Sequence, residues 1–427
     1  MSRRFGSLAE ALSYQQNVHG PSIDLGLERV REVARRLELL DPRCPTAIVG
    51  GTNGKGSTAC TLAALLSACG RRTGLFTSPH LLRYNERVQI DGVPIADAAL
   101  LDAFERIEAA LHGVTLTFFE YNTLAALDVF RDARVTALVL EVGLGGRLDA
   151  TNIIDADVAV LCSVGMDHRD WLGDSLELIG AEKAGIFRAA RPVVLGSADM
   201  PDSVWRRAHE LRCEIHAAGR EFRVRRQSAA ARASWDYDSE HCRLAALPAP
   251  MLDGAVQYDN AAAALTALNL LGAPGACEHE RIARGLGAVR LPGRFQRVPG
   301  EVEWILDVAH NEPAAQVLAA ALSAEPPEGR TLAVLGMLGD KDVAAVVRAL
   351  DSNIDQWLLA SLDEEPRGLS AEALAARLPA LRGAIERCGS VTQSCARARA
   401  LARPRDRVIV LGSFHTVGPA LAWLGLY

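Results

Sequence analysis

The sequence runs Ile48-Val49-Gly50-Gly51-Thr52-Asn53-Gly54-Lys55-Gly56-Ser57-Thr58 near its N-terminus, and this stretch decides the fold. An apolar run over residues 47–49 predicts a short strand, and the pattern that begins at Thr58 predicts a long helix. Backbone N–H groups of the glycine-rich turn between them can approach phosphate oxygens closely, and the helix N-terminus adds positive potential. The stretch therefore predicts an α/β domain that binds a nucleotide.

Two side chains of this stretch can take part in nucleotide chemistry. Lys55 would reach the terminal phosphates, and Ser57 would be a ligand of Mg²⁺. The standard phosphate-binding loop has Ser or Thr directly after the lysine, whereas Gly56 intervenes here. The alternative is a glycine-rich turn with a solvated lysine. Four glycines together with Asn53 and a Ser-Thr pair favour the phosphate cradle.

Length and composition bound the class of protein. The 427 residues exceed one ordinary core, so two domains are expected and three remain open. Hydrophobic residues make up 49% and charged residues 23%, which is typical of a globular protein. The net charge is −6 and no basic block stands out, which argues against a nucleic-acid partner.

The expected cellular location follows from the absence of a signal peptide, a membrane span and paired cysteines in the sequence. The basic start at residues 1–4 is followed by Glu10 and polar residues rather than an apolar run, so no signal peptide is expected. No run approaches the length of a membrane span, so no membrane partner is expected. The nine cysteines are scattered without a Cys-x-x-Cys pair, so neither a disulfide nor structural zinc is expected. Together these observations predict a cytoplasmic protein.

Several predicted strands end in polar residues. A buried-strand pattern at 135–141 ends in Glu141, and a second at 157–164 leads to Asp167-His168. Residues 77–87 follow another short strand and contain Pro79, which predicts a ligand-facing loop. In an open parallel sheet, ligands bind beyond the carboxyl ends of the strands. We therefore expect the cradle, Glu141 and the pair Asp167-His168 to serve one site.

The rest of the chain alternates between strands and helices. Residues 218–252 have confused periodicity and are predicted to form short strands, and strong helices are predicted at 260–271 and 279–286. A Pro-Gly segment at 288–297 is the predicted linker between domain 1–287 and domain 298–427. In the second domain strands are predicted at 302–306, 331–335, 356–360 and 407–411, with helices between them, which indicates a parallel sheet.

Separated motifs resemble one family. The cradle is similar to the loop of the Mur ligase superfamily, the ATP-dependent acid–amine ligases. The run Glu141-Val142-Gly143-Leu144-Gly145-Gly146-Arg147-Leu148-Asp149-Ala150-Thr151-Asn152 resembles the signature of its folylpolyglutamate synthase and dihydrofolate synthase branch. The likeness extends from about residue 20 to the C-terminus. It implies a P-loop-type ATP-binding domain with a mainly parallel sheet and a smaller Rossmann-like α/β C-terminal domain.

The resemblance implies two Mg²⁺ sites. Their expected protein ligands are Ser57, Ser78, Glu141 and His168. A monovalent cation is an additional candidate. Lys183, in the run Ala181-Glu182-Lys183-Ala184-Gly185, matches a lysine that the family carbamylates, whereas a surface ion pair is the alternative. Lys55, Lys183 and His168 are the expected catalytic residues. Arg169 stands where the family has a small hydroxyl residue.

The resemblance also implies which residues bind the substrates. ATP is expected to contact Gly51, Thr52, Asn53, Gly54, Lys55, Gly56, Ser57, Thr58, Asn260, Arg294 and Asp307, with the last two supplied by the second domain. His310 and Ser413 are expected near the glutamate site. Glu312 occupies the position where the family has proline, and Pro313 follows one residue later.

Three further segments resemble those that bind dihydropteroate in bifunctional members. They contain Asp24, Leu25 and Gly26, then Thr117, Phe118, Phe119 and Glu120, then Leu148, Asp149 and Ala150. An aromatic ring can stack on a flat pterin, and a carboxylate can accept hydrogen bonds from its N–H groups. The alternative is that both phenylalanines belong to the core at the end of a buried strand.

The sequence therefore predicts an ATP-dependent ligase that joins L-glutamate to dihydropteroate and to reduced folates through an acyl phosphate. Its expected partners are these small molecules alone, and a monomer is expected. A folylpolyglutamate synthase only and a murein-precursor ligase remain as alternatives. A GTPase-type switch is disfavoured because the sequence contains no Asn-Lys-x-Asp motif.

Overall fold

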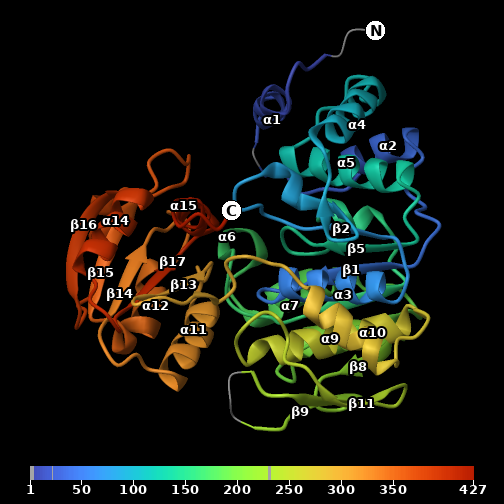
Figure 1. Cartoon of the computed structure of the whole chain (residues 1–427). Helices are drawn as coiled ribbons and strands as arrows, with labels where there is room; N and C mark the ends of the chain where they lie inside the picture. The colour runs from blue at the N-terminus through green and yellow to red at the C-terminus, as the bar shows by residue number, and fades with distance from the viewer. Residues whose placement is uncertain (1–3, 22, 229–231) are drawn as a thin grey trace. The chain divides into compact units, whose positions relative to one another are not determined.

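The computed structural model describes residues 4–21, 23–228 and 232–427. Residues 1–3 of the basic start and residues 229–231 of the 218–252 segment lie outside these ranges. The chain forms two compact units (Figure 1). The first runs to Val164 and continues through Asp170–Met251 and Gln257–Arg290, and the second contains Gly165–Arg169, Leu252–Val256 and Leu291–Tyr427. The main change of unit at Arg290 falls inside the 288–297 segment, but the two short segments of the second unit were not predicted.

The first unit is built on an eight-stranded sheet with the order β4-β3-β2-β5-β1-β6-β7-β8. The strands from β2 to β8 in this order are parallel, and only β3 and β4 are antiparallel. This confirms the predicted mainly parallel sheet. The strands are β1 (Thr46–Gly50), β2 (Thr73–Phe76), β3 (Val88–Ile90), β4 (Val93–Pro94), β5 (Ala137–Glu141), β6 (Val158–Leu161), β7 (Pro192–Leu195) and β8 (Glu214–Ala217).

Helices cover both faces of this sheet. The central strands β1 and β5 are buried along their whole length, as the continuous apolar runs predict for a sheet covered on both sides. Figure 1 shows α4 and α5 on one face and α3, α9 and α10 on the other. The helices of this unit are α1 (Leu8–Asn17), α2 (Glu28–Arg36), α3 (Lys55–Ala68), α4 (Asp97–Ala110), α5 (Phe118–Asp132), α7 (Leu176–Lys183), α8 (Asp202–Glu210), α9 (Val256–Leu270) and α10 (His279–Ala288). The short helix α6 (Arg169–Leu172) lies between β6 and α7.

Two predicted helix starts were wrong by a few residues. Helix α3 begins at Lys55 rather than at Thr58, because Gly54 in the left-handed region ends the turn. The sequence pattern also predicts a helix over roughly residues 120–131, and this helix, α5, begins at Phe118 because Thr117 and Glu120 form a capping box. The left-handed glycine at α3 and the capping box at α5, and not the apolar pattern, set the first residue of each helix.

The predicted short strands of the 218–252 segment are confirmed. A three-stranded antiparallel sheet has the order β11-β10-β9, and its apolar side chains Trp235 and Tyr237 are buried. The strands are β9 (Phe222–Arg226), β10 (Trp235–Ser239) and β11 (Arg243–Leu247).

The second unit has a six-stranded sheet with the order β12-β13-β17-β14-β15-β16. All neighbours are parallel except β12 and β13. The sheet contains the four predicted strands, together with β12 and β16, which were not predicted. The strands are β12 (Gln296–Val298), β13 (Glu303–Asp307), β14 (Thr331–Leu335), β15 (Gln356–Ser361), β16 (Ala384–Ser390) and β17 (Arg407–Leu411). The helices are α11 (Glu312–Ala324), α12 (Val343–Leu350), α13 (Ala371–Ala375), α14 (Val391–Leu401) and α15 (Phe414–Trp423).

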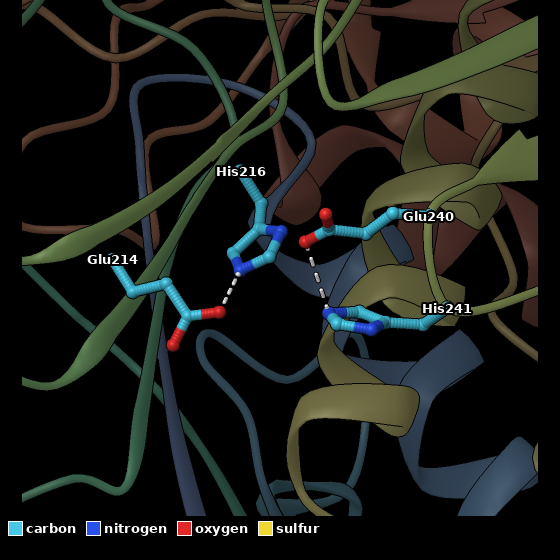
Figure 2. A group of neighbouring side chains, drawn as sticks. All are labelled: Glu214, His216, Glu240 and His241. Atoms are coloured by element: carbon cyan, nitrogen blue, oxygen red, sulfur yellow. Dashed lines mark hydrogen bonds and ion pairs between the residues drawn. The ribbon is translucent and has the colours of Figure 1, made fainter.

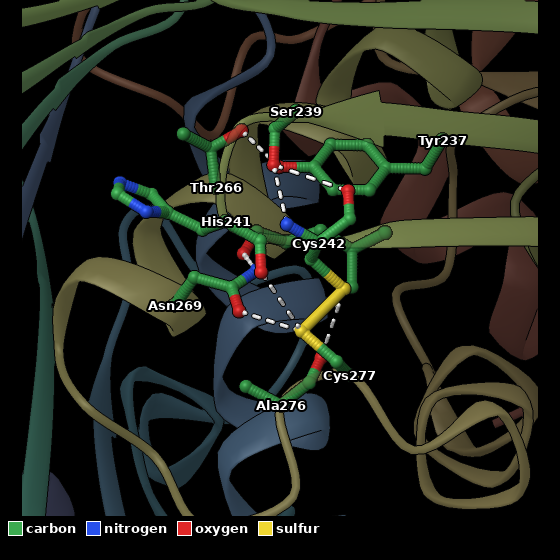
Figure 3. Close-up of a disulfide and its surroundings, with 9 residues drawn as sticks. Tyr237, Ser239, His241, Cys242, Thr266, Asn269, Ala276 and Cys277 are labelled. Atoms are coloured by element: carbon green, nitrogen blue, oxygen red, sulfur yellow. Dashed lines mark hydrogen bonds between the residues drawn. A yellow bond between two sulfur atoms is a disulfide. The ribbon is translucent and has the colours of Figure 1, made fainter.

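The prediction that no disulfide forms was wrong. Cys242 and Cys277 form a disulfide with a Cα–Cα distance of 5.7 Å (Figure 3). The two cysteines are 35 residues apart, so no local spacing points to the pair, and only the tertiary fold brings them together. Across the described ranges, no helix is both long enough and apolar enough to span a membrane.

Candidate active site

The phosphate cradle is held by its own glycines and by the residue that follows β6. Gly51 and Gly54 both have positive φ, and a Cβ at Gly54 would lie 2.6 Å from Asn260 Oδ1. The backbone N–H of Thr52 donates to Ser163 O at 2.8 Å, and that of Asn53 donates to Ser163 Oγ at 3.1 Å. The loop is therefore fixed in shape by contacts on its sheet side.

The first turn of α3 carries the predicted phosphate and metal residues. Because the helix begins at Lys55, the N–H groups of Gly56, Ser57 and Thr58 belong to the helix end that attracts anions. Thr58 donates through its hydroxyl to Asn260 Oδ1 at 3.4 Å. The structure thus brings Asn260, which lies 202 positions further along the chain, to the cradle.

Two lysines meet at one carbonyl of the cradle. Lys55 Nζ donates to Gly51 O at 3.0 Å and to Thr52 O at 3.1 Å. Lys183 Nζ, at the end of α7, donates to the same Gly51 O at 3.0 Å, and Lys183 is only 5% exposed. Lys183 is therefore a buried residue of the cradle, and the expected alternative of a surface ion pair is wrong for it. Its neighbour Glu182 instead pairs with Arg147.

Glu141 and Ser78 are neighbours at the carboxyl end of the sheet. Glu141 is the last residue of β5 and pairs in register with Val49, the penultimate residue of β1. The backbone N–H of Ser78 donates to Glu141 Oε2 at 3.0 Å, and Glu141 is 4% exposed. Mg²⁺ prefers hard oxygen ligands, so the Glu141 carboxylate and the Ser57 and Ser78 hydroxyls have the donor chemistry of such a site.

The glycine loop after β5 brings α7 to the cradle. A Cβ at Gly146 would lie 2.8 Å from the carbonyl oxygens of Glu182 and Lys183. Arg147 N donates to Glu182 O at 2.9 Å. Only glycine allows this backbone approach, which sets the position of Lys183.

The buried carboxylate of Asp149 holds the backbone of the same loop through hydrogen bonds. Its carboxylate accepts hydrogen bonds from the N–H groups of Gly143, Leu144 and Thr151 and from the Thr151 hydroxyl, at 2.7–3.0 Å. Burial raises the pKa of Asp149 above its ordinary value, and these donors act in the opposite direction. Asp149 was expected at the dihydropteroate site, and in the structure both of its oxygens bind the loop. Of its predicted neighbours, Ala150 is buried and Leu148 is half-buried.

The segment with two phenylalanines starts a helix rather than ending a strand, so that part of the alternative was wrong. Thr117 is the N-cap of α5, and Glu120 Oε2 accepts from Thr117 N at 2.7 Å. Phe118 and Phe119 are both half-buried. The Phe119 ring fills the space over Gly143, whereas the Phe118 ring lies 6.1 Å from that of Tyr84.

Arg29 connects two of the predicted pterin segments. Its guanidinium lies 2.7 Å from Asp24 Oδ2 and 3.3 Å from Glu120 Oε1. His19 Nε2 also contacts Asp24 Oδ2, at 3.1 Å. Leu25 and Gly26 follow Asp24 in a half-buried loop before α2. The structure therefore brings Asp24 and Glu120 together through a residue that sequence reasoning had missed.

In the second unit, Asp307 fixes the backbone beside Arg294. Its oxygens accept from Phe295 N at 2.7 Å and from Ala309 N at 2.8 Å. Burial raises the pKa of Asp307, while the Arg294 charge acts in the opposite direction. The Arg294 guanidinium lies 4.9 Å from the centre of the Phe414 ring.

Asp167 is the hub of a charged cluster in the same unit. Its carboxylate contacts Lys341 Nζ at 2.7 Å, Asn311 Nδ2 at 2.9 Å and His310 Nε2 at 3.7 Å. Burial alone would raise the pKa of Asp167, but the neighbouring His310 imidazole and the Lys341 charge hold it well below its usual range. His168 follows with a positive φ of 52°, and its side chain is about one-third exposed.

Two further predictions concern helix starts in this unit. Ser413 is the N-cap of α15 and accepts from His415 N at 3.1 Å. Asn311 is the N-cap of α11, so Glu312 and Pro313 are the first two residues of that helix. Proline is tolerated there because the first N–H groups of a helix have no partner within it. Glu312 therefore fits a regular helix start.

Sequence reasoning assigned no site role to Ser163, Arg29, Asn311 and Lys341, and it named Asp167 only together with His168 beyond the end of a strand. One signal was available for Lys341: lysine occurs only at positions 55, 183 and 341 of the whole chain, whereas the remaining 43 of the 46 basic residues are arginine. Two of the three lysines, Lys55 and Lys183, lie at the phosphate cradle, and the third, Lys341, lies in the cluster around Asp167. Lysine and arginine are not interchangeable where a compact charge is needed.

The comparisons with known proteins agree with this geometry. Residues 49–268 match the Mur ligase middle domain, and residues 293–414 match the Mur ligase glutamate ligase domain. The chain is 45% identical to the dihydrofolate synthase/folylpolyglutamate synthase of Escherichia coli K12 over 96% of this chain and 94% of the relative. It is 39% identical to the enzyme of the same name from Haemophilus influenzae over 96% of each chain.

Solved structures are similar over the whole chain. The structure of Escherichia coli FolC in complex with DHPP and ADP matches with a TM-score of 0.93 at 42% identity, covering 100% of this chain and 99% of the other. A bifunctional folylpolyglutamate synthase/dihydrofolate synthase with Mn, AMPPNP and L-glutamate bound matches with a TM-score of 0.90 at 42% identity, covering 100% of both chains. The chain belongs to the dihydrofolate synthase/folylpolyglutamate synthase family of Mur ligases.

Proposed function

We propose that this protein is an ATP-dependent ligase that adds L-glutamate to dihydropteroate and to the glutamate tail of reduced folates. The observation that carries the proposal is the convergence of Lys55, Lys183 and Glu141 on the cradle. The chain also matches relatives of this activity along nearly its whole length. These relatives belong to the folate branch, so a murein-precursor ligase and a GTPase-type switch are not proposed.

The reaction proceeds in two steps. The substrate carboxylate attacks the γ-phosphorus of ATP, the bond to the leaving ADP breaks, and an acyl phosphate forms. The amine of L-glutamate then attacks the acyl carbon, phosphate leaves, and the amine loses a proton. Phosphoryl transfer asks a protein mainly for positioning and charge neutralisation.

The proposed roles of the residues rest on the family resemblance, and the contacts described above support them. Lys55 and the first turn of α3 bind the ATP phosphates, with Gly51, Thr52, Asn53 and Gly54 shaping the loop. Ser57, Ser78, Glu141 and His168 would hold two Mg²⁺ ions, which would neutralise phosphate charge. In the second unit, Arg294 and Asp307 would contact ATP, and His310 and Ser413 would serve glutamate. We add Lys341 and Asp167 to the glutamate-side candidates because they form one cluster with His310.

Lys183 is proposed to act as a carbamate. Carbamylation would convert its ammonium into an N–H that can keep the bond to Gly51 O and a carboxylate that can face a metal. The dihydropteroate segments are proposed at Asp24, Thr117 to Glu120 and the loop of Asp149. A cytoplasmic monomer is proposed as the working form.

The proposal is tested with purified protein, ATP, Mg²⁺ and L-glutamate. Phosphate release is measured with dihydropteroate and, separately, with tetrahydrofolate. Glutamate-dependent release with both is expected. Release with tetrahydrofolate alone would leave a folylpolyglutamate synthase, and release with neither would overturn the proposal.

A further inference from the structure

Two histidines and two glutamates face one another beside β8, the edge strand of the eight-stranded sheet. They are Glu214, His216, Glu240 and His241 (Figure 2). One ligand atom from each residue lies within 4.8 Å of those of the other three. Imidazole nitrogens and carboxylate oxygens are the ligands of zinc and similar divalent ions.

The fold builds this cluster from two directions. Glu214 and His216 are two residues apart in β8, so strand periodicity puts both side chains on one face of the sheet edge. Glu240 and His241 form the turn between β10 and β11, which Ser239 closes by donating its N–H to Cys242 O at 2.9 Å. The cluster thus joins the large sheet to the three-stranded sheet.

The ligands are held before any ion arrives. His216 Nε2 lies 2.9 Å from Glu214 Oε1, and His241 Nε2 lies 3.4 Å from Glu240 Oε1. The two imidazole rings have centroids 5.6 Å apart. His216 is 3% exposed, whereas the other three side chains reach solvent, so an ion would have both a buried anchor and an open entry.

A disulfide also restrains the turn that carries His241. The next residue, Cys242, forms the disulfide with Cys277, and Cys277 Sγ lies 3.5 Å from the carbonyl oxygen of His241 (Figure 3). A ligand turn that is fixed in this way loses little freedom when it binds an ion.

We propose that Glu214, His216, Glu240 and His241 bind one divalent transition-metal ion, with Zn²⁺ as the occupant. Tetrahedral zinc has ligands about 2.0–2.1 Å away, which places ligand atoms roughly 3.3 Å from one another. The four ligand atoms now lie within 4.8 Å of one another, so binding an ion would draw the more distant of them closer together. Mg²⁺ and Ca²⁺ fit less well, because both prefer all-oxygen ligands.

The site is separate from the nucleotide chemistry. Strand β8 is three strands away from β1 in the sheet, which corresponds to about 14 Å. Four protein ligands leave no open position for a substrate, so the ion has a structural role that fastens the β10–β11 turn to β8. The proposal departs from the expectation that the chain holds no structural zinc, which rested on cysteine spacing alone.

The test measures zinc binding by three full-length proteins: wild type, Glu214→Gln/His241→Ala and the control His209→Ala, which removes an exposed histidine of α8. Each is dialysed into thiol-free buffer with saturating Mg²⁺ and a non-hydrolysable ATP analogue, which occupy the catalytic sites. Zinc is then titrated against a chromophoric chelator, and thermal unfolding is followed with and without zinc.

Wild type and His209→Ala are expected to bind one equivalent of zinc more than the double variant. Zinc should raise the unfolding temperature of these two proteins and leave that of the double variant unchanged. Cobalt in place of zinc should give the visible absorption of a tetrahedral ion in the same two proteins. Equal stoichiometry in all three proteins would overturn the site. If the double variant does not fold by circular dichroism, the single variant Glu240→Gln replaces it, with weaker zinc binding expected and unchanged binding as the contradicting outcome.

Discussion

The side-chain nitrogens of Lys55 and Lys183 lie at the same distance, 3.0 Å, from the carbonyl oxygen of Gly51. The two lysines approach it from 4 and 132 positions away along the chain. Two ammonium charges this close repel each other, and partial burial strengthens the repulsion. Carbamylation of Lys183 would replace one of the cations by an anion and turn the repulsion into attraction. The geometry thus gives a physical reason for one of the two lysines to lose its positive charge, and the family resemblance points to Lys183.

We predict that Lys183→Ala loses turnover and regains part of it with added acetate or formate. A small carboxylate can occupy the space of the carbamate and restore its charge. Rates are measured with and without the anion, and the mass of the intact wild-type protein is compared before and after carbonate removal. A fully active Lys183→Ala, or an active wild-type protein that shows no added CO₂, would contradict the modification.

Lys55→Ala is expected to lower the rate by ~10²–10³-fold, since a preorganised charge that stabilises the transition state is removed. Circular dichroism and thermal unfolding should remain close to those of wild type. Lys55→Arg is the matched variant: it keeps the charge but not the compact shape. Near-normal turnover of a folded Lys55→Ala would show that the cradle lysine has no role in catalysis.

The cradle glycine can be tested against a control with the same backbone strain. Gly54 and Gly92 have φ of 86° and 77°. A Cβ added at Gly54 would lie 2.6 Å from Asn260 Oδ1, whereas a Cβ added at Gly92 would have no atom within 4 Å. Alanine at either position should cost about 1–2 kcal/mol of stability from the left-handed backbone. Only Gly54→Ala should also weaken binding of an ATP analogue, as measured by calorimetry. Equal affinities would show that Asn260 moves away without effect on the cradle.

Asp149→Asn should destabilise the protein, because an amide cannot accept all four hydrogen bonds that the carboxylate accepts. An unpaired buried donor costs about 1–3 kcal/mol. Denaturant unfolding measures the loss. Asp155→Asn, at an exposed ion pair with Arg188, is the control and should change stability little. Similar stabilities of the two variants would mean that the loop finds other acceptors.

The sequence was most informative where chemistry and pattern coincide. The cradle, the end of β5 at Glu141 and the two parallel sheets follow from apolar runs that stop at glycines or carboxylates. Contacts that depend on tertiary structure could not be predicted in this way. Ser163 supports the cradle from the loop after β6, and the disulfide joins cysteines with no local signal. The meeting of Lys55 and Lys183 required the fold itself, since the motif of Lys183 only marks it as a residue of interest.

Glu120 offers a way to separate a structural role from a substrate role in the pterin segment. Its Oε2 accepts the capping hydrogen bond from Thr117 N, while its Oε1 lies 3.3 Å from the Arg29 guanidinium. Glutamine can keep a capping box but carries no charge. Glu120→Gln should therefore keep wild-type stability, whereas Glu120→Ala should lose about 1 kcal/mol from the missing cap. If the carboxylate also helps to bind dihydropteroate, as we propose, Glu120→Gln should raise the KM for dihydropteroate and leave kcat nearly unchanged. Stability comes from denaturant unfolding, and KM comes from phosphate release. A Gln variant with unchanged KM and an Ala variant that only loses stability would assign Glu120 to the helix start alone.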